Sequence, residues 1–203
     1  MTPSIDHHVS IVLLAAGGAA RFGSAKQVIA IDGVAMVRHC ARNAMNSAAP
    51  VVVVTGAHRK IVEDELRDLD VTIVHNADWN LGMGSSIACG VDVVAQNPAV
   101  EAAIILLADQ PLVSDDDLRE LISQHRKRPD CIIAASANGT IMPPCLFARS
   151  YFPELQTLHD QTGARAVLQR HGDRVVTVPM PNAAIDIDTK EAYAQFCASR
   201  RPV

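Results

Sequence analysis

Aromatic residues are scarce in this chain: Phe, Trp and Tyr make up 3% of its 203 residues, with a single tryptophan. Because 49% of the residues are nonetheless hydrophobic, the core must be built from Val, Ile, Leu and Ala. That bias favours buried parallel strands covered by alanine-rich helices over an aromatic-rich sandwich. The length suits one domain with a sizeable core, and no repeat, linker or composition break interrupts the chain. We therefore expect a single domain over 1–203.

A long basic run is also missing, and the formal net charge is -4. Nucleic-acid-binding proteins usually carry a cationic face, so this composition disfavours that class. No apolar stretch approaches the ~18 residues that span a bilayer, and the opening MTPSIDHH lacks the pattern of a secretory signal. The five cysteines are scattered without zinc-ligand or redox spacing, which is typical of free thiols in a reducing compartment. These absences predict a soluble, cytoplasmic protein without nucleic-acid or membrane partners.

Short apolar runs alternate with segments of helical periodicity along the whole chain. The runs predict buried strands at 9–16, 51–55, 71–75, 102–109, 131–136, 174–179 and 184–188. Helices are expected at 34–48, 59–68, 85–96, 115–127, 162–171 and 189–200. Ser114 and Asp117 have the spacing of a capping box at the start of the fourth helix. This alternation predicts an α/β fold with a three-layer, doubly wound, mostly parallel sheet, whose ligands bind beyond the carboxyl ends of the strands.

The loop after the first apolar run, GGAARFGSAK (17–26), matches neither of two well-known phosphate motifs. A dinucleotide fingerprint needs G-x-G-x-x-G, whereas the first two glycines here are adjacent. A Walker A loop needs lysine directly after its second glycine, whereas two residues separate Gly23 from Lys26. The loop does allow close backbone approach and supplies two cations, Arg21 and Lys26, which suits the phosphates of a nucleoside triphosphate. A tight turn with two solvated cations is the alternative.

A second glycine turn follows the third apolar run. Gly82 and Gly84 precede Ser85 and Ser86, where a helix is expected to open. A helix N-terminus after glycine presents unpaired N–H groups to an anion, although an ordinary N-cap serine explains the same pattern. Trp79 is expected either at the rim of a ligand site or in a partly buried packing role.

Acidic residues follow two further apolar runs. Asp109 ends the run AIILLAD, where it is well placed to hold Mg²⁺ through oxygen, in competition with a plain turn role. Asp186 and Asp188 are expected on one face of the short strand 184–188. Either of them would complete a Mg²⁺ site with Asp109, and Asp188 would alternatively cap the last helix. The choice between the two stays open at this point.

Taken in order, these segments resemble the MobA-like nucleotidyltransferase family, specifically its molybdenum cofactor cytidylyltransferase group. The resemblance rests on LAAGGAARFGSAK against the family pattern L-A-A-G-x-S-x-R-[MF]-G-x-x-K, followed by GMGSS, LADQP, PPCLF, TGARAVL and DIDT. The LAAG opening is similar to the cytidylyl branch, whereas the related guanylyltransferases typically read LAGG. The resemblance implies a Rossmann-like nucleotidyltransferase fold. It also implies Mg²⁺-dependent transfer of CMP from CTP to the terminal phosphate of molybdopterin, with release of pyrophosphate.

The resemblance further implies roles for individual residues. Arg21, Lys26 and Asp109 would be catalytic, the two cations covering the triphosphate, while Asp109 with Asp188 or Asp186 would hold the metal. The implied nucleotide site consists of Leu14, Ala15, Ala16, Gly17, Gly18, Arg21, Lys26, Gly84, Ser85, Ser86 and Asp109. The implied partners are CTP or another NTP, a phosphorylated pterin cofactor and, transiently, a molybdoenzyme or its maturation chaperone.

The chain departs from the family pattern at three places. Ala19 replaces a serine of the phosphate loop, Ile141 and Met142 stand where relatives often have Arg and Gly, and HDQTGAR replaces GDxGAR. These departures keep two alternatives open. One is a transferase of the same fold that uses GTP or another acceptor, and the other is a non-catalytic accessory protein of the cofactor. A dinucleotide-dependent dehydrogenase is disfavoured, because the fingerprint is missing.

Overall fold

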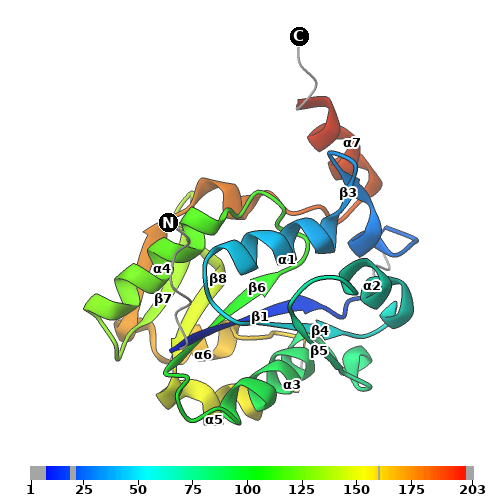
Figure 1. Ribbon diagram of the computed structural model, residues 1–203. Helices are drawn as coiled ribbons and strands as arrows, with labels where there is room; N and C mark the ends of the chain where they lie inside the picture. The colour runs from blue at the N-terminus through cyan, green and yellow to red at the C-terminus, as the bar shows by residue number, and fades with distance from the viewer. Residues whose placement is uncertain (1–7, 19–21, 160, 200–203) are drawn as a thin grey trace.

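A seven-stranded sheet forms the centre of the protein in the computed structural model, which describes residues 8–18, 22–159 and 161–199 (Figure 1). Its strands are β1 (Val9–Ala15), β4 (Val51–Thr55), β5 (Thr72–His75), β6 (Ala102–Leu107), β7 (Ile132–Ala137), β8 (Thr140–Ala148) and β9 (Val175–Pro179). Their spatial order is β5-β4-β1-β6-β8-β7-β9. Neighbouring strands are parallel except where β8 pairs with β6 and β7. The expected mostly parallel α/β sheet is confirmed.

Helices cover both faces of this sheet (Figure 1). One face carries α1 (Met36–Asn46), α2 (Arg59–Leu66) and α4 (Asp115–Lys127), and the other carries α3 (Met83–Ala95), α5 (Phe152–Gln156) and α6 (Arg165–Arg170). Because side chains alternate along a strand, β1 contributes to both cores: Ile11 and Leu13 pack on the first face, Val12 and Leu14 on the second. The last helix, α7 (Lys190–Ser199), lies beside the small hairpin β2 (Ala30–Ile31) and β3 (Val34–Ala35), where the Tyr193 hydroxyl donates to the Ala30 carbonyl oxygen at 2.8 Å.

Strand β8 is absent from the sequence-based expectations because it contains two adjacent prolines. Its ladder with β7 pairs Ala134 with Cys145 and then Ala135 with Met142. Pro143 and Pro144 therefore fall at a shift in register, where they have no ladder partner. Since proline has no backbone N–H to donate, a bulge is the one place in a sheet interior where it is tolerated.

The expected strand at 184–188 is wrong. A 3₁₀ turn, Pro181–Ala184, leads into an irregular segment there. Ile187 is fully buried, and its N–H donates to the Asp109 carbonyl oxygen at 3.0 Å. That bond holds the segment beside the end of β6, although it does not form a ladder. Asp186 and Asp188 consequently stay on the same side of the chain as each other, with Ile187 turned into the core.

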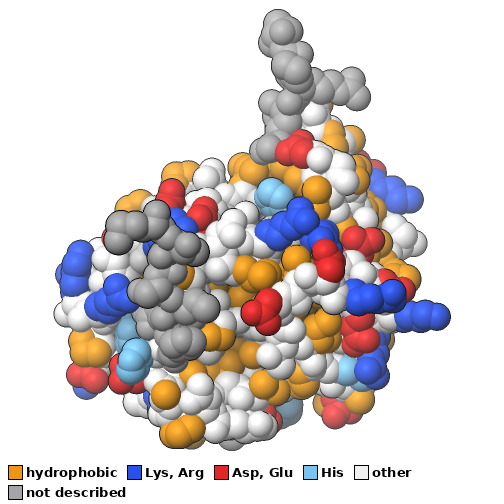
Figure 2. Space-filling model, viewed as in Figure 1, with side chains coloured by type: hydrophobic (Ala, Val, Ile, Leu, Met, Phe, Trp, Pro, Cys, Tyr) orange, Lys and Arg blue, Asp and Glu red, His pale blue; other side chains and the backbone are white. Residues whose placement is uncertain are grey.

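The other expected strands and helices are present, with their ends shifted by no more than three residues. The capping box at α4 is confirmed, since the Ser114 hydroxyl accepts from the Asp117 N–H and the Asp117 carboxylate accepts from the Ser114 N–H. The expected free thiols are also found, as all five cysteines are unpaired by disulfides. Within the described part of the chain, every helix is too short or too polar to cross a membrane. On the face seen in Figure 2, the described Lys and Arg side chains are interspersed with acidic ones and form no extended cationic surface.

Helix α3 packs so closely on the sheet that Gly90 has no room for a side chain. A Cβ at this position would stand 2.3 Å from Cγ1 of Val12 and 2.9 Å from Cγ2 of Val54. We expect Gly90→Ala to lower the free energy of unfolding by about 1–3 kcal/mol, because overpacking against two stiff, buried valines exceeds the gain of ~1 kcal/mol in helix propensity. Urea denaturation measures the effect. Gly172→Ala is the control, since its Cβ would meet nothing within 4 Å; equal midpoints for the two variants would refute the close packing.

Candidate active site

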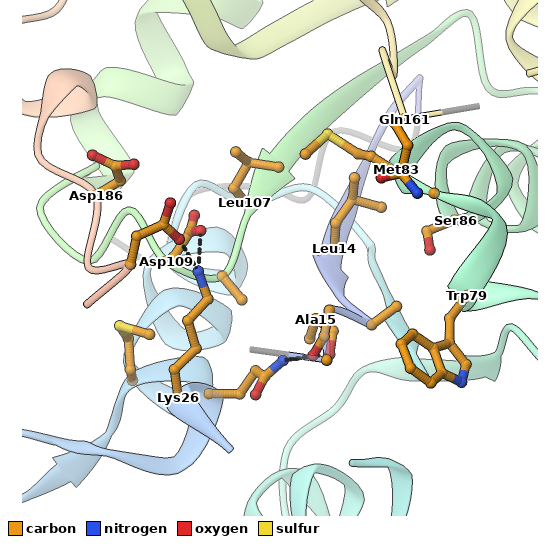
Figure 3. Close-up of a pocket in the computed structure, with 18 of the residues that line it drawn as sticks. Leu14, Ala15, Lys26, Trp79, Met83, Ser86, Leu107, Asp109, Gln161 and Asp186 are labelled. Atoms are coloured by element: carbon orange, nitrogen blue, oxygen red, sulfur yellow. Dashed lines mark hydrogen bonds and ion pairs between the residues drawn. The ribbon is translucent and has the colours of Figure 1, made fainter. Parts of the chain in front are cut away.

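A cavity of about 440 Å³ opens beyond the carboxyl ends of β1 and β6 (Figure 3). The sequence-predicted residues that line it are Leu14, Ala15, Ala16, Gly17, Gly18, Lys26, Ser86, Asp109, Asp186 and Asp188. Gly84 and Ser85 lie on the first turn of α3 but do not line the cavity. Arg21 and Ala19 lie outside the described residues. The structure thus brings together segments that are up to 174 residues apart in the chain, from Leu14 to Asp188.

Lys26 forms an ionic cluster with two carboxylates at one end of this cavity (Figure 3). It comes from a short 3₁₀ turn, Lys26–Val28, and its Nζ donates to Oδ2 of Asp109 at 2.7 Å and also to Oδ1 of Asp188. All three side chains are largely buried. The delayed lysine of the loop therefore reaches the carboxylate at the tip of β6 as well as the segment after Ala184.

The pKa values in this cluster reflect burial together with the interactions among its charged groups. Burial raises the pKa of Asp109, and the attraction of Lys26 only partly offsets this while the nearby Asp188 and Asp186 raise it further. For Lys26, burial lowers the pKa, but the combined attraction of Asp109 and Asp188 exceeds that effect and raises it. The leading causes differ: burial dominates for Asp109, whereas the attraction of two carboxylates prevails for Lys26, and three carboxylates lie near one described ammonium. The cluster is therefore prepared to take up further positive charge.

The implied Mg²⁺ fits this cluster through Asp109. Among the described residues, no three His, Cys, Asp or Glu side chains gather closely enough to form a metal site by themselves. Oδ1 of Asp109 is nevertheless buried and has no hydrogen-bond partner among the described atoms. Such an oxygen is costly unless something pairs with it, and Mg²⁺ is commonly held by one or two carboxylates plus substrate phosphates. The donor set thus suits a cation that completes its coordination on a bound nucleotide.

Gln27 is a cavity residue that the sequence analysis misses. It is buried, and its Nε2 donates to the carbonyl oxygens of Gly17 at 2.6 Å and Ala15 at 3.4 Å. These bonds fix the end of β1 and the start of the glycine loop, so that the backbone there keeps its place beside the cavity. No spacing rule singles out this residue; its only signal is a polar side chain between Lys26 and the apolar Val28.

The N-terminus of α3 forms the other end of the cavity. The helix begins at Met83 after Gly82, whose φ of 135° favours glycine, and no side chain caps it. The Ser85 hydroxyl donates to the Gly82 carbonyl oxygen and accepts from the Asn76 amide, so its role is to hold the turn. The first N–H groups of the helix stay available to an anion.

Trp79 combines a position in the cavity wall with a packing contact. It lines the cavity, and it is half-buried against the glycine loop, where a Cβ at Gly18 would stand 3.0 Å from its ring. Figure 3 places it at the opposite end of the cavity from Asp186. An aromatic face at this end is suited to stacking against a flat group of a ligand.

A second cavity, of about 630 Å³, adjoins the first. Met83 and Leu107 line both of them. The remaining walls of the second cavity come from α3, β6, the β7–β8 turn and the segment around α6, and they are Ile87, Ile105, Gly139, Thr140, Ile141, Met142, Pro143, Cys145, Thr162, Ala164, Arg165, Leu168 and Gln169. The departures from the family pattern at 141–142 thus lie in this second cavity.

Comparisons with known proteins identify a family over most of the chain. The model of the MobA-like NTP transferase domain matches residues 11–175. The purine catabolism protein PucB of Bacillus subtilis is 33% identical, over 57% of this chain and 56% of that protein, so the match spans only about half of its length. The nicotine blue oxidoreductase of Paenarthrobacter nicotinovorans is 29% identical over 90% of this chain and 93% of that protein. The molybdenum cofactor cytidylyltransferase of Escherichia coli is 23% identical over 91% of this chain and 93% of that protein.

Solved structures agree on the fold. A mycobacterial homologue of Mycobacterium tuberculosis rv0371c, from strain JC1, superposes with a TM-score of 0.81 at 23% identity, covering 95% of this chain and 96% of that one. Rv0371c of M. tuberculosis in complex with manganese superposes with a TM-score of 0.75 at 22% identity, covering 95% and 99%. At these identities the likeness concerns the fold, and it confirms the expected nucleotidyltransferase architecture.

Proposed function

Since the chain belongs to the MobA-like NTP transferase family, we propose that it transfers CMP from CTP to the terminal phosphate of molybdopterin, with Mg²⁺ as the cofactor and in the cytoplasm. The observation that carries the proposal is the cluster of Lys26, Asp109 and Asp188 in one cavity with the glycine loop. The choice of CTP is supported by the LAAG opening of the loop and by the cytidylyltransferase relative.

The reaction requires no protein base. The second pKa of a phosphate monoester is ~6, so the acceptor phosphate is largely ionised at neutral pH. One of its oxygens forms a bond to the α-phosphorus of CTP. The bond from that phosphorus to the oxygen that bridges to the β-phosphate breaks, and the electron pair leaves with pyrophosphate. The protein's part is positioning and neutralisation of charge.

The described residues divide these tasks. Lys26, together with Arg21 from outside the described residues, covers the triphosphate and the departing pyrophosphate. Asp109 and Asp188 would hold Mg²⁺, and Asp186 adds negative charge near Asp109. When bound, the metal supplies Lewis-acid stabilisation of charge on the phosphate oxygens. The backbone from Leu14 to Gly18 accommodates the base and ribose, with Ser86 of α3 nearby.

Pyrophosphate release tests the proposal. The purified protein is incubated with Mg²⁺, each of the four NTPs in turn, and molybdopterin or no acceptor. We expect pyrophosphate with CTP and molybdopterin together, and little with either alone. Release with GTP instead would reassign the base, and CTP binding without release would favour the accessory role.

A further inference from the structure

We propose that Gln110 is a positioning residue: its side chain fixes the segment that carries Asp186 and Asp188 beside Asp109. The inference rests on the proposed nucleotidyl transfer, because it concerns the carboxylates that would hold Mg²⁺ in that reaction. Gln110 directly follows Asp109 in the run LADQP, and it lines neither of the two cavities. Its role is therefore exerted through other residues and not through contact with a ligand.

The segment 185–188 lies outside regular secondary structure. It connects the 3₁₀ turn, Pro181–Ala184, to the region before α7, and none of the described strands pairs with it. One backbone bond, from the Ile187 N–H to the Asp109 carbonyl oxygen at 3.0 Å, joins it to the end of β6. A single hydrogen bond holds one point of a segment but does not fix its direction, which requires a second contact.

Gln110 supplies this second contact. Its side chain is buried, with 4% of its surface exposed, and its Nε2 donates to the Ala183 carbonyl oxygen at 2.7 Å and to the Pro143 carbonyl oxygen at 2.9 Å. The segment is thus held at Ala183 by Gln110 and at Ile187 by the residue before it, Asp109. Two anchors four residues apart fix both its position and its direction.

The Gln110 side chain is itself attached to fixed structure. Pro143 lies at the register shift of β8 and has no ladder partner, so its carbonyl oxygen is available to the amide. The Gln110 backbone belongs to a turn in which its N–H donates to the Leu107 carbonyl oxygen at 3.4 Å and its carbonyl oxygen accepts from the Val113 N–H at 3.2 Å. The amide therefore joins the segment to two parts of the central sheet, β6 and β8.

This position requires a side chain that donates two hydrogen bonds. Both of its partners are carbonyl oxygens, and the NH₂ group of an amide carries two N–H donors. A carboxylate of the same length would repel both oxygens, and a hydrocarbon side chain would leave both without this donor. Because the acceptors are backbone atoms, they persist whatever side chains stand at 143 and 183.

The two anchors determine where the carboxylates of the segment stand. Asp186 lies between the anchored residues, and Asp188 directly follows the second of them. Figure 3 shows Asp186 on the same side of the cavity as Lys26. Since Oδ1 of Asp188 accepts from the Lys26 ammonium, a shift of the segment would move this carboxylate out of the cluster. Loss of a group that orients metal ligands typically lowers metal affinity 10- to 100-fold, and we assign that role to Gln110.

Gln110→Met tests the assignment by two measurements. Methionine is close to glutamine in shape and size, so a residue that only fills space should tolerate the change. The dissociation constant of Mn²⁺ is measured by electron paramagnetic resonance in the presence of a non-hydrolysable CTP analogue, and we expect it to rise about tenfold or more. Without metal or nucleotide, hydrogen exchange in peptides spanning 181–189, followed by mass spectrometry, should accelerate about fivefold or more.

Asn43→Leu is the matched control. Nδ2 of Asn43 donates to the Val113 carbonyl oxygen at 2.9 Å, so this variant also removes a bond from an amide to a carbonyl, at the turn that contains Gln110. It removes no bond to the segment 183–188 and should leave both measurements unchanged.

Gln110→Asn is the second variant. It keeps an amide but is one methylene too short to bridge the two carbonyl oxygens, so both measurements should change in the same direction as with methionine. It provides both readouts if the methionine variant does not fold.

The failures of the two proposals are distinguishable. If either measurement is unchanged in the Gln110 variants, or if Asn43→Leu changes both to the same extent, the assignment of Gln110 is overturned even when pyrophosphate is released from CTP. If the Gln110 variants weaken Mn²⁺ binding and accelerate exchange as expected, but no combination of NTP and acceptor releases pyrophosphate, the positioning role stands and the transfer reaction falls.

Discussion

Asp109→Asn is expected to lower the rate of nucleotidyl transfer by about 10²-fold or more, since the variant removes the charge that holds the metal while keeping the shape of the side chain. The buried Oδ1 of Asp109 has no partner among the described residues, and an amide in its place is a poor ligand for Mg²⁺. The measurement is the rate of pyrophosphate release from CTP at saturating acceptor.

The same variant should not lower the melting temperature at neutral pH. Burial raises the pKa of Asp109 in the folded protein above its unfolded value. A carboxyl with a raised pKa favours the fold when protonated, and that contribution is lost as the pH rises through the folded pKa. At neutral pH the ionised side chain therefore destabilises the folded protein, and asparagine removes this destabilisation. A lower melting temperature with unchanged turnover would give Asp109 a structural role in place of a catalytic one.

Asp68→Asn is the matched control. Asp68 is exposed on the surface, where two hydrogen bonds from Arg38 hold its pKa at about 2, below its usual value. The ion pair of Asp68 stabilises the fold above the pKa that this carboxyl has in the unfolded chain, and this contribution is lost as the pH falls toward about 2. The pH dependence is therefore opposite to that expected for Asp109. This variant should leave the transfer rate unchanged, so it separates loss of a carboxylate in general from loss of the one in the cavity.

Lys26→Met is expected to lower the transfer rate by about 10²-fold or more and, at the same time, to tighten the binding of a divalent cation in the absence of nucleotide. The Lys26 ammonium donates to both Asp109 and Asp188, so a metal ion competes with it for the same carboxylates. Methionine keeps most of the apolar stem and removes the charge. The bound nucleotide should have the corresponding effect in the native protein, because its phosphates attract the lysine.

Manganese serves as the probe, with free Mn²⁺ followed by electron paramagnetic resonance with and without the CTP analogue. The native protein should bind Mn²⁺ more tightly when the nucleotide is present, and Lys26→Met should bind it tightly without nucleotide. Lys60→Met, an exposed lysine of α2, should behave as the native protein. If Lys26→Met binds Mn²⁺ no more tightly than the native protein, the ammonium and the metal do not compete.

The sequence predicts those parts of the fold that depend on local pattern. The buried parallel strands are continuous apolar runs, and the start of α4 is set by a capping box, so both can be predicted from neighbouring residues. Strand β8 is hidden because its two prolines oppose a strand locally, and only the register with β7 shows why they are tolerated. The expectation of a strand at 184–188 fails for the opposite reason. Its pattern fits a strand, but none of the described strands pairs with it in a ladder.

The candidate site likewise has residues that the sequence predicts and others that only the tertiary structure reveals. Lys26 and Asp109 are predictable because the carboxyl ends of parallel strands meet at one edge of a sheet, and each residue follows an apolar run. The contacts of Lys26 with Asp109 and Asp188 join residues more than eighty positions apart in the sequence, so they depend on the tertiary structure. Gln27 and the second cavity depend entirely on packing between distant segments, for which spacing along the sequence carries no signal.

The two cavities are lined by different parts of the chain, so they can change independently in evolution. The first is lined mainly from residues 14–36, 79–86 and 107–109, and the second mainly from residues 139–145 and 162–169, with Met83 and Leu107 in common. Mutations in the β7–β8 turn therefore change one cavity while the other keeps its lining. A gene encoding this fold can acquire a new preference in the second cavity without passing through forms that have lost the first. The bulge at Pro143 and Pro144 lies within the part that is free to diverge.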